Sequence, residues 1–146
     1  MKTIVVPVDL SAAATQVVKA ACDLASRTGA GLLLVHIVEP PVVVSDLYGM
    51  EGGFIEESIA AATQVGKRRL QALARSCEKR GLRTRTYQGI GSPVAEILRL
   101  AHKAAFIVIG SHGHGAVFDL LVGSTTQGVL KRARCPGMVV PVRARR

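Results

Sequence analysis

Three glycines at a fixed spacing are the first feature of this sequence that could do chemistry. Gly110 ends a short apolar run, Gly113 follows after two residues, and Gly123 follows after nine more, directly before Ser124 and Thr125. Glycine lets the backbone approach a ligand closely, and a helix that begins with Ser-Thr offers N–H groups and hydroxyls to an anion. The spacing therefore predicts a site for a phosphate-bearing ligand.

Asp9 is the charged residue that could share this site, because it ends the apolar run 3–8. An acid at this point can simply favour the N-terminus of the next helix through the helix dipole. Beside phosphates it would instead hold a Mg²⁺ ion or accept a hydrogen bond from a ribose hydroxyl. We favour the second interpretation, because the fold predicted below brings Asp9 and the glycines together.

Several known phosphate-binding and catalytic motifs are absent. No Gly-Lys-Ser/Thr follows the glycines, and no Gly-x-Gly-x-x-Gly follows the first apolar run. His112 and His114 have no obvious third metal ligand nearby, and the His-x-Gly-His signature of nucleotidylyl transferases belongs after the first strand. Neither a Ser-His-Asp order nor a carboxylate pair indicates hydrolysis. The sequence offers no convincing general base or nucleophile, and a surface loop with a Ser-capped helix remains the alternative to a phosphate site.

Alternating elements must position these residues. Apolar or β-branched runs predict strands at 3–8, 32–38, 83–88, 106–109 and 138–142. Helical spacing and capping residues predict helices at 12–28, 55–80, from 93 onward and at 124–134. Ser11 is expected to cap the first helix, Gly29 to close it, and Ser92-Pro93 to open the third. The buried face of the second helix is expected to contain Ile55, Ile59, Ala62, Val65, Leu70, Leu73 and Cys77.

This alternation predicts the α/β class, with one open parallel sheet of five strands and helices on both faces. In the order 3-2-1-4-5, the third and fifth strands are edges, and Pro141 supports the edge position of the fifth. Ligands bind at the carboxyl ends of such strands, where the winding direction reverses. That point lies between the strands that Asp9 and Gly110 end. The segment 42–53 is expected to be a mobile loop, His36 a core histidine, and His102 a helix-surface residue.

Composition limits the remaining possibilities. The chain has 146 residues, 49% of them hydrophobic, which favours a single globular domain spanning 1–146. No run is long enough to cross a membrane, and three scattered cysteines favour a reducing compartment, so we expect a cytoplasmic protein. The net charge of +9 favours anionic partners, but basic residues are not interleaved with aromatic ones, so nucleic acid is not the expected partner.

The residues quoted so far resemble the universal stress protein family over essentially the whole chain. The resemblance includes the stretches 4–11 and 34–40, Gly91-Ser92-Pro93, and most specifically Gly110-x2-Gly113-x9-Gly123-Ser124. The last pattern is that of the ATP-binding members. The resemblance implies ATP, or ADP or AMP, as the ligand, with Mg²⁺ contacted indirectly through Asp9.

The resemblance also implies roles for single residues. Pro7, Val8 and Ile37 would line the adenine pocket, Ile109 and Gly110 would flank the ribose, and Asp9 would lie at the ribose and triphosphate. The phosphates would be cradled by Gly113, His114, Gly123, Ser124 and Thr125. His114 stands where the family often has Arg or Lys.

A nucleotide-responsive stress or regulatory protein is the implied function, acting as a homodimer paired through the C-terminal strand. Gly137 and Pro141 are a departure that weakens this pairing edge. Two alternatives remain: a slow Mg²⁺-dependent ATPase or phosphotransfer enzyme that uses Asp9, and a nucleotide-free interaction module.

Overall fold

The chain alternates strands and helices from end to end, as the sequence predicts. A computed structural model describes residues 1–41, 52–113 and 122–142. The strands are β1 (Thr3–Pro7), β2 (Gly31–Val38), β3 (Thr84–Ile90), β4 (Phe106–Gly110) and β5 (Gly137–Val140). The helices are α1 (Ala14–Thr28), α2 (Gly52–Glu78), α3 (Pro93–Ala101) and α4 (Ser124–Arg132).

The five strands form one sheet in the order β3-β2-β1-β4-β5, and every neighbouring pair is parallel. This order confirms the predicted fold class. The central strands β1 and β4 pair through Ile4 with Phe106 and Val5 with Ile107, so their carboxyl ends, at Pro7 and Gly110, lie at the same edge of the sheet. The winding direction reverses between these two strands, which is where open α/β sheets bind ligands.

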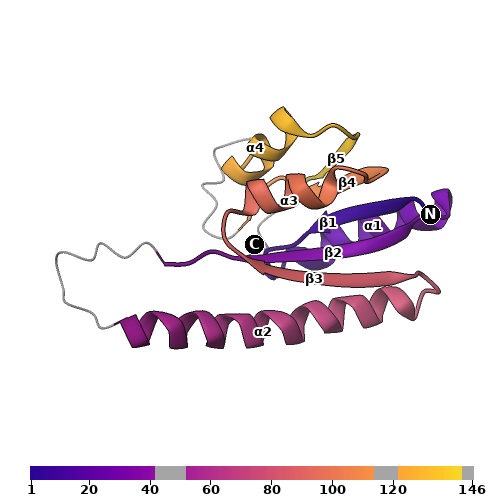
Figure 1. The fold of residues 1–146 in the computed structure, drawn as a ribbon. Helices are drawn as coiled ribbons and strands as arrows, with labels where there is room; N and C mark the ends of the chain where they lie inside the picture. Colours follow the sequence, from indigo (N-terminus) through magenta and orange to yellow (C-terminus); the bar gives the residue numbers. More distant parts are fainter. Residues whose placement is uncertain (42–51, 114–121, 143–146) are drawn as a thin grey trace.

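Helices cover both faces of the sheet, α1 and α2 on one side and α3 and α4 on the other (Figure 1). Successive side chains of a strand point to opposite faces, so each inner strand supplies both cores. In β1, Ile4 and Val6 belong to the core under α1 and α2, whereas Val5 belongs to the core under α3 and α4. Because both faces are buried, the inner strands read as continuous apolar runs in the sequence.

Glycine and serine set several of the boundaries that were predicted. Gly29 follows α1 with a φ of 68°, a left-handed conformation that glycine adopts without steric cost. Ser92 caps α3 by accepting a hydrogen bond from the backbone N–H of Ala95, and Pro93 occupies the first helical position. These boundaries are therefore set by local chemistry that is legible in the sequence.

The predicted capping role of Ser11 is wrong. Helix α1 begins at Ala14, and its N-cap residue, Ala13, makes no side-chain hydrogen bond. The Ser11 hydroxyl instead donates to Asp9 Oδ1 at 2.7 Å. Ser11 lies two residues before the N-cap, and its hydroxyl donates to the upstream carboxylate in a local turn instead of accepting from a helix N–H.

The predicted buried face of α2 is correct only in its C-terminal half. Leu70 and Cys77 are buried, but the side chain of Val65 is 52% exposed. Gly66 is the residue that faces the sheet there, because a Cβ atom at this position would lie only 2.9 Å from His36 Cδ2. The helix therefore packs against the sheet here through a residue without a side chain, which an apolar spacing pattern does not mark.

Strand β5 is an edge strand, as predicted, but Pro141 is not the cause. The strand ends at Val140, so Pro141 lies beyond the paired residues and removes no donor from the sheet. The edge position follows from the strand order alone. In the part of the chain that the structure describes, no helix has the length and apolar character needed to span a membrane.

Candidate nucleotide site

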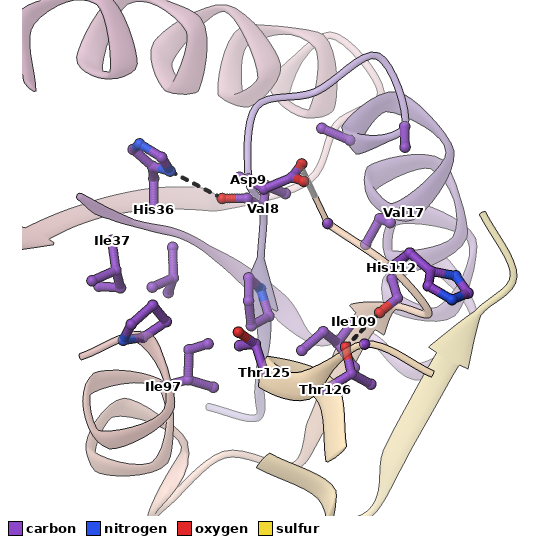
Figure 2. Close-up of a pocket in the computed structure, with 18 of the residues that line it drawn as sticks. Val8, Asp9, Val17, His36, Ile37, Ile97, Ile109, His112, Thr125 and Thr126 are labelled. Atoms are coloured by element: carbon purple, nitrogen blue, oxygen red, sulfur yellow. Dashed lines mark hydrogen bonds between the residues drawn. The ribbon is translucent and has the colours of Figure 1, made fainter. Parts of the chain in front are cut away.

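A cavity of about 590 Å³ opens at the carboxyl ends of β1, β2 and β4 (Figure 2). Its walls include every predicted site residue that the structure describes: Pro7, Val8, Asp9, Ile37, Ile109, Gly110, Gly113, Gly123, Ser124 and Thr125. His114, the remaining predicted residue, lies outside the described ranges, as does nearly all of the predicted loop 42–53. The topology therefore brings together residues that are up to 118 positions apart in the chain (125 minus 7).

Asp9 is held in place by the turn between β1 and α1. Its Oδ1 atom accepts hydrogen bonds from the backbone N–H of Ser11 at 3.0 Å and from the Ser11 hydroxyl at 2.7 Å. Leu10 between them has a φ of 63°, the sole positive value among the described non-glycine residues. Arg69 from α2 donates through Nη1 to the Leu10 carbonyl at 3.3 Å. The two hydrogen bonds from Ser11 thus fix the direction of the Asp9 carboxylate, and the bond from Arg69 holds the turn that carries it.

The second carboxylate oxygen of Asp9 is buried and has no hydrogen-bond partner among the described residues. It faces Gly113, where an added Cβ atom would lie 3.0 Å from Oδ2. Buried polar atoms are almost always satisfied in proteins, so an orphan acceptor is informative. A bound hydroxyl, water or hydrated metal ion would supply the missing partner.

The segment 111–123, which joins β4 to α4 and is called the glycine loop below, has its two ends hydrogen-bonded to each other. The backbone N–H of Gly123 donates to the Ser111 carbonyl at 2.7 Å. The buried hydroxyl of Thr126 donates to the Gly110 carbonyl, also at 2.7 Å (Figure 2). These two bonds attach the start of α4 to the end of β4, so the helix N-terminus is presented to the cavity.

Helix α4 begins with Ser124 after the N-cap Gly123, which has extended backbone and makes no side-chain capping bond. The first N–H groups of a helix have no partner within the helix, and the helix dipole places partial positive charge there. Ser124 and Thr125 line the cavity at this point. The arrangement suits an anion, and it is the one expected from the Gly-Ser-Thr sequence.

The opposite part of the cavity is mainly apolar. Ile37 and Ile97 face each other across it, from β2 and α3 respectively (Figure 2). Ile97 is buried in the core below, and Ile37 is half-buried at the cavity wall. A flat apolar group such as a nucleobase fits between aliphatic walls of this kind, whereas phosphates do not.

His36 was predicted to be a core histidine, and this is only partly right. The ring is hydrogen-bonded, with Nδ1 3.1 Å from the Val8 carbonyl, but the residue is half-buried and lines the cavity. Because a carbonyl only accepts, Nδ1 must carry the proton. The ring projects from β2 to the side opposite Ile37 (Figure 2). Alternation along the strand could have signalled this, since residues 36 and 37 must face different helices.

A polar cluster of Tyr87, Glu96 and Arg99 lies near the apolar wall, since Glu96 directly precedes Ile97 in α3. The Tyr87 hydroxyl donates to Glu96 Oε2 at 2.9 Å, and Arg99 donates to the same oxygen at 2.8 Å. The hydrogen bond from Arg99, together with that from Tyr87, holds the pKa of the Glu96 carboxyl below its usual value. Gly89 leaves room for the Tyr87 ring, because an added Cβ would lie 3.0 Å from it.

Sequence reasoning missed about half of the cavity wall. The missed residues from helices are Ala13, Ala14, Val17, Ala62, Pro93, Ile97 and Thr126, and those from strands and loops are Val35, His36, Val38, Glu39 and His112. Most are small or apolar, so their residue types carry no chemical signal. They become wall residues because α1, α3 and α4 begin at this edge of the sheet and α2 passes it.

No group of three or more His, Cys, Asp or Glu residues with metal-binding geometry occurs within residues 1–41, 52–113 and 122–142. A Mg²⁺ ion usually binds proteins through one or two carboxylates together with phosphate oxygens and water. The orphan Oδ2 of Asp9 fits that mode of binding. The site therefore suits Mg²⁺ only as a companion of a phosphate ligand.

Comparison with known sequences yields one family. A model of the Universal stress protein family matches residues 1–141. The curated relatives include a universal stress protein of Thermus aquaticus, encoded in the QAH/OAS sulfhydrylase 3′ region. It is 35% identical over 150 residues, and the match covers 95% of this chain and 98% of the relative.

Comparison with solved structures yields the same fold. The MJ0577 protein of Methanocaldococcus jannaschii superimposes with a TM-score of 0.84 at 24% identity, covering 99% of this chain and 98% of that one. A universal stress protein from Archaeoglobus fulgidus in complex with dAMP gives 0.64 at 23% identity, covering 95% and 97%. Another, in complex with cAMP, gives 0.66 at 22% identity, covering 96% of both chains.

Proposed function

Given that this chain belongs to the universal stress protein family, we propose that it binds an adenine nucleotide, ATP or its products ADP and AMP, in the cavity at the carboxyl ends of the strands. Binding would alter the contacts that the protein makes with its partners, so the protein acts as a nucleotide-responsive regulator in stress. Two solved relatives in complex with dAMP and cAMP support an adenine ligand.

The observation that carries this proposal is the orphan Oδ2 atom of Asp9 facing Gly113. The carboxylate is fixed through Oδ1, so Oδ2 is not free to turn toward solvent. A ribose hydroxyl or a hydrated Mg²⁺ ion supplies the partner that this oxygen lacks. The ion, when bound, would neutralise phosphate charge and allow Asp9 to lie beside the phosphates.

The proposed pose follows from the polarity of the walls. The adenine ring lies against Pro7, Val8 and Ile37, and the ribose lies between Asp9, Ile109 and Gly110. The phosphates lie at the N-terminus of α4, where Gly113, Gly123, Ser124 and Thr125 line the cavity. His114 remains a predicted phosphate contact. The cavity of about 590 Å³ is within the usual range of ligand sites.

Release and rebinding of nucleotide test the proposal directly. The purified protein is heat-denatured, and the released small molecules are separated on a column and compared with adenine nucleotide standards. Calorimetry then measures binding of added ATP with Mg²⁺. A lack of nucleotide in the first experiment together with a lack of binding in the second would sink the proposal.

The phosphate cradle is tested by Gly123→Val. The branched side chain adds bulk at the N-cap of α4, where phosphate is proposed to bind, so nucleotide affinity should fall by at least about tenfold. Gly123→Ala is the matched control, because an added Cβ meets only Ser111 O at 3.4 Å and His112 Cα at 3.6 Å, which is ordinary contact. Circular dichroism checks that both variants fold. Unchanged affinity in folded Gly123→Val would exclude the cradle.

A slow Mg²⁺-dependent ATPase is the second candidate, favoured by the same Asp9 carboxylate. Single-turnover hydrolysis of ATP that disappears in Asp9→Asn would support it. Hydrolysis unchanged in that variant would remove Asp9 from any catalytic role.

Pairing of two copies through β5 is the proposed assembly. The strand is an edge, and Met138 within it and Leu130 beside it are about 40% exposed. Met138→Lys should convert a dimer to a monomer in light scattering, since a buried charge opposes the contact. The control is Val65→Lys, at an exposed position on α2. A location in the cytoplasm stays a prediction.

A further inference from the structure

Two cysteines from different helices meet in the core between α1 and α2. The sulfur atoms of Cys22 and Cys77 lie 3.3 Å apart, although the residues are 55 positions apart in the chain. Both side chains are buried, at 1% and 0% exposure. Neither residue lines the nucleotide cavity. We propose that this pair is an oxidation site, which forms a disulfide between α1 and α2 when the protein meets a peroxide.

The geometry needs little change. A disulfide has a sulfur–sulfur distance of about 2.05 Å, so the two atoms must approach by roughly 1.2 Å. Side-chain rotation and a small shift of the helices supply a movement of this size. The third cysteine, Cys135, is only partly buried and packs in the core on the other face of the sheet. It is therefore a natural internal control for reactivity that does not depend on pairing.

An ion pair crosses the same contact between the helices. Arg80, just after α2, donates through Nη2 to Asp23 Oδ1 at 2.6 Å, and Asp23 directly follows Cys22. The backbone N–H of Arg80 donates to the Cys77 carbonyl at 3.0 Å. The hydrogen bond that Arg80 donates to Asp23 is the main reason that the pKa of Arg80 is raised, and attraction to the two cysteines adds to it. The ion pair thus joins the two helices directly beside the cysteine pair.

Burial sets the rate of the reaction. Desolvation, followed by the contact with Cys22, raises the pKa of Cys77 to about 12, so the thiolate is scarce while the helices are packed. Oxidation therefore requires α1 and α2 to separate transiently, and it should be slow in the native protein. It should accelerate under conditions that loosen the fold, such as heat, because local opening exposes both thiols together.

The chemistry balances with hydrogen peroxide as the oxidant. One thiolate attacks a peroxide oxygen and becomes a sulfenic acid, while the O–O bond breaks and the leaving hydroxide takes up a proton to form water. The second sulfur then attacks the sulfenic sulfur, forming the S–S bond and releasing a second water. In total, two thiols are oxidised by two electrons and one peroxide is reduced to two waters. The close second thiol captures the sulfenic acid before it is oxidised further.

The disulfide would join α1, which precedes β2 in the chain, to α2, which follows it. It would therefore close a long loop of the chain. Cross-linking a long loop stabilises a protein mainly by restricting its unfolded chain. A gain on the order of 10 °C in Tm is expected for a chain of this size. Oxidation would therefore make this protein more resistant to unfolding under the conditions that produce peroxide.

The test uses the full chain. Reduced protein is treated with hydrogen peroxide near the onset of unfolding, remaining thiols are alkylated, and peptides are mapped by mass spectrometry. We expect a Cys22–Cys77 cross-linked peptide, loss of two of the three thiols, and a Tm increase that dithiothreitol reverses. Cys135→Ala should behave as the parent does, whereas Cys22→Ala and Cys77→Ala should lose the Tm increase.

Three results would overturn the proposal: cross-links that involve Cys135, oxidation of the pair only to sulfinic or sulfonic acid, or a disulfide that leaves Tm unchanged. Mapping of the unsubstituted protein decides the first two even if an alanine variant fails to fold. Nucleotide binding plays no part in these measurements, so the two proposals fail independently.

Discussion

The Ser111 carbonyl accepts a hydrogen bond of 2.7 Å from the backbone N–H of Gly123, so residues twelve positions apart close the glycine loop at its base. Ser111 is also bonded to the C-terminal segment, because its N–H donates to the Val140 carbonyl and its hydroxyl accepts from the Val142 N–H. One buried serine thus links the loop, the start of α4 and the edge strand β5. The end of the cavity at which we propose that phosphate binds is therefore connected to the sheet edge proposed for pairing.

Thr126 provides the second connection at the loop base, and its loss should be measurable. Thr126→Val keeps the side-chain shape but leaves the buried Gly110 carbonyl without the 2.7 Å hydrogen bond. We expect a loss of about 1–3 kcal/mol in the free energy of unfolding, measured by urea denaturation. Thr126→Ser retains the hydroxyl and should lose less. A Thr126→Val variant as stable as the parent would show that the hydroxyl does not stabilise this junction.

Asp9 has two separable roles, which two substitutions distinguish. Asp9→Asn retains an Oδ1 acceptor for both hydrogen bonds from Ser11, so the ligand-free protein should unfold at nearly the same urea concentration. Asp9→Ala removes that acceptor and should cost about 1 kcal/mol. Both variants remove the negative charge and should weaken binding of ATP with Mg²⁺, as measured by calorimetry. Retained affinity in Asp9→Asn would mean that the charge does not contact the ligand.

Gly113 and Asp9 should be coupled in a double-mutant cycle. A methyl group at Gly113 would lie 3.0 Å from Asp9 Oδ2, so Gly113→Ala must displace the carboxylate. Its effect on nucleotide affinity should be roughly tenfold in the parent protein. In an Asp9→Ala background the atom that clashes is gone, and the further loss should be small. Fully additive losses would show that Gly113 acts on the ligand without passing through Asp9.

The cluster of Tyr87, Glu96 and Arg99 predicts a dependence of stability on pH. Hydrogen bonds from Arg99 and Tyr87 hold the folded-state pKa of Glu96 below its usual value of 4.5. A group with a depressed folded pKa stabilises the protein above its unfolded pKa, and this stability is lost as pH falls through the folded pKa. Glu96→Gln should therefore be less stable than the parent at pH 7, and the difference should shrink below pH 4.5.

Denaturation curves at several pH values measure this difference. Asp23→Asn is the matched control, since the hydrogen bond from Arg80 likewise lowers the pKa of an exposed carboxyl at another place in the fold. The Asp23 variant should show a similar trend without any effect on the cavity wall. A Glu96 difference that stays constant with pH would exclude an ionic contribution from this cluster.

The amino-acid sequence alone predicted the α/β class and the strand order, both of which the structure confirms, and it predicted the polar residues of the candidate site. Short, continuous, β-branched apolar runs are typical of strands buried on both faces, and alternation with helices leaves few topologies open. That topology predicts that Asp9 lies near Gly110. The spacing of Gly113, Gly123 and Ser124 predicts a phosphate-binding site. These signals are local, because each depends on a residue's own backbone or charge.

The tertiary structure decided which ordinary residues complete the site. Ala62, Ile97 and Thr126 line the cavity because α2, α3 and α4 each pass or begin at this edge of the sheet, and their residue types do not indicate it. In the structure, the Ser11 hydroxyl bonds to Asp9 and does not cap helix α1. The sulfur atoms of Cys22 and Cys77 lie 3.3 Å apart. Such pairings depend on the distance between elements remote in the chain. Packing of whole helices sets that distance, and no spacing in the sequence encodes it.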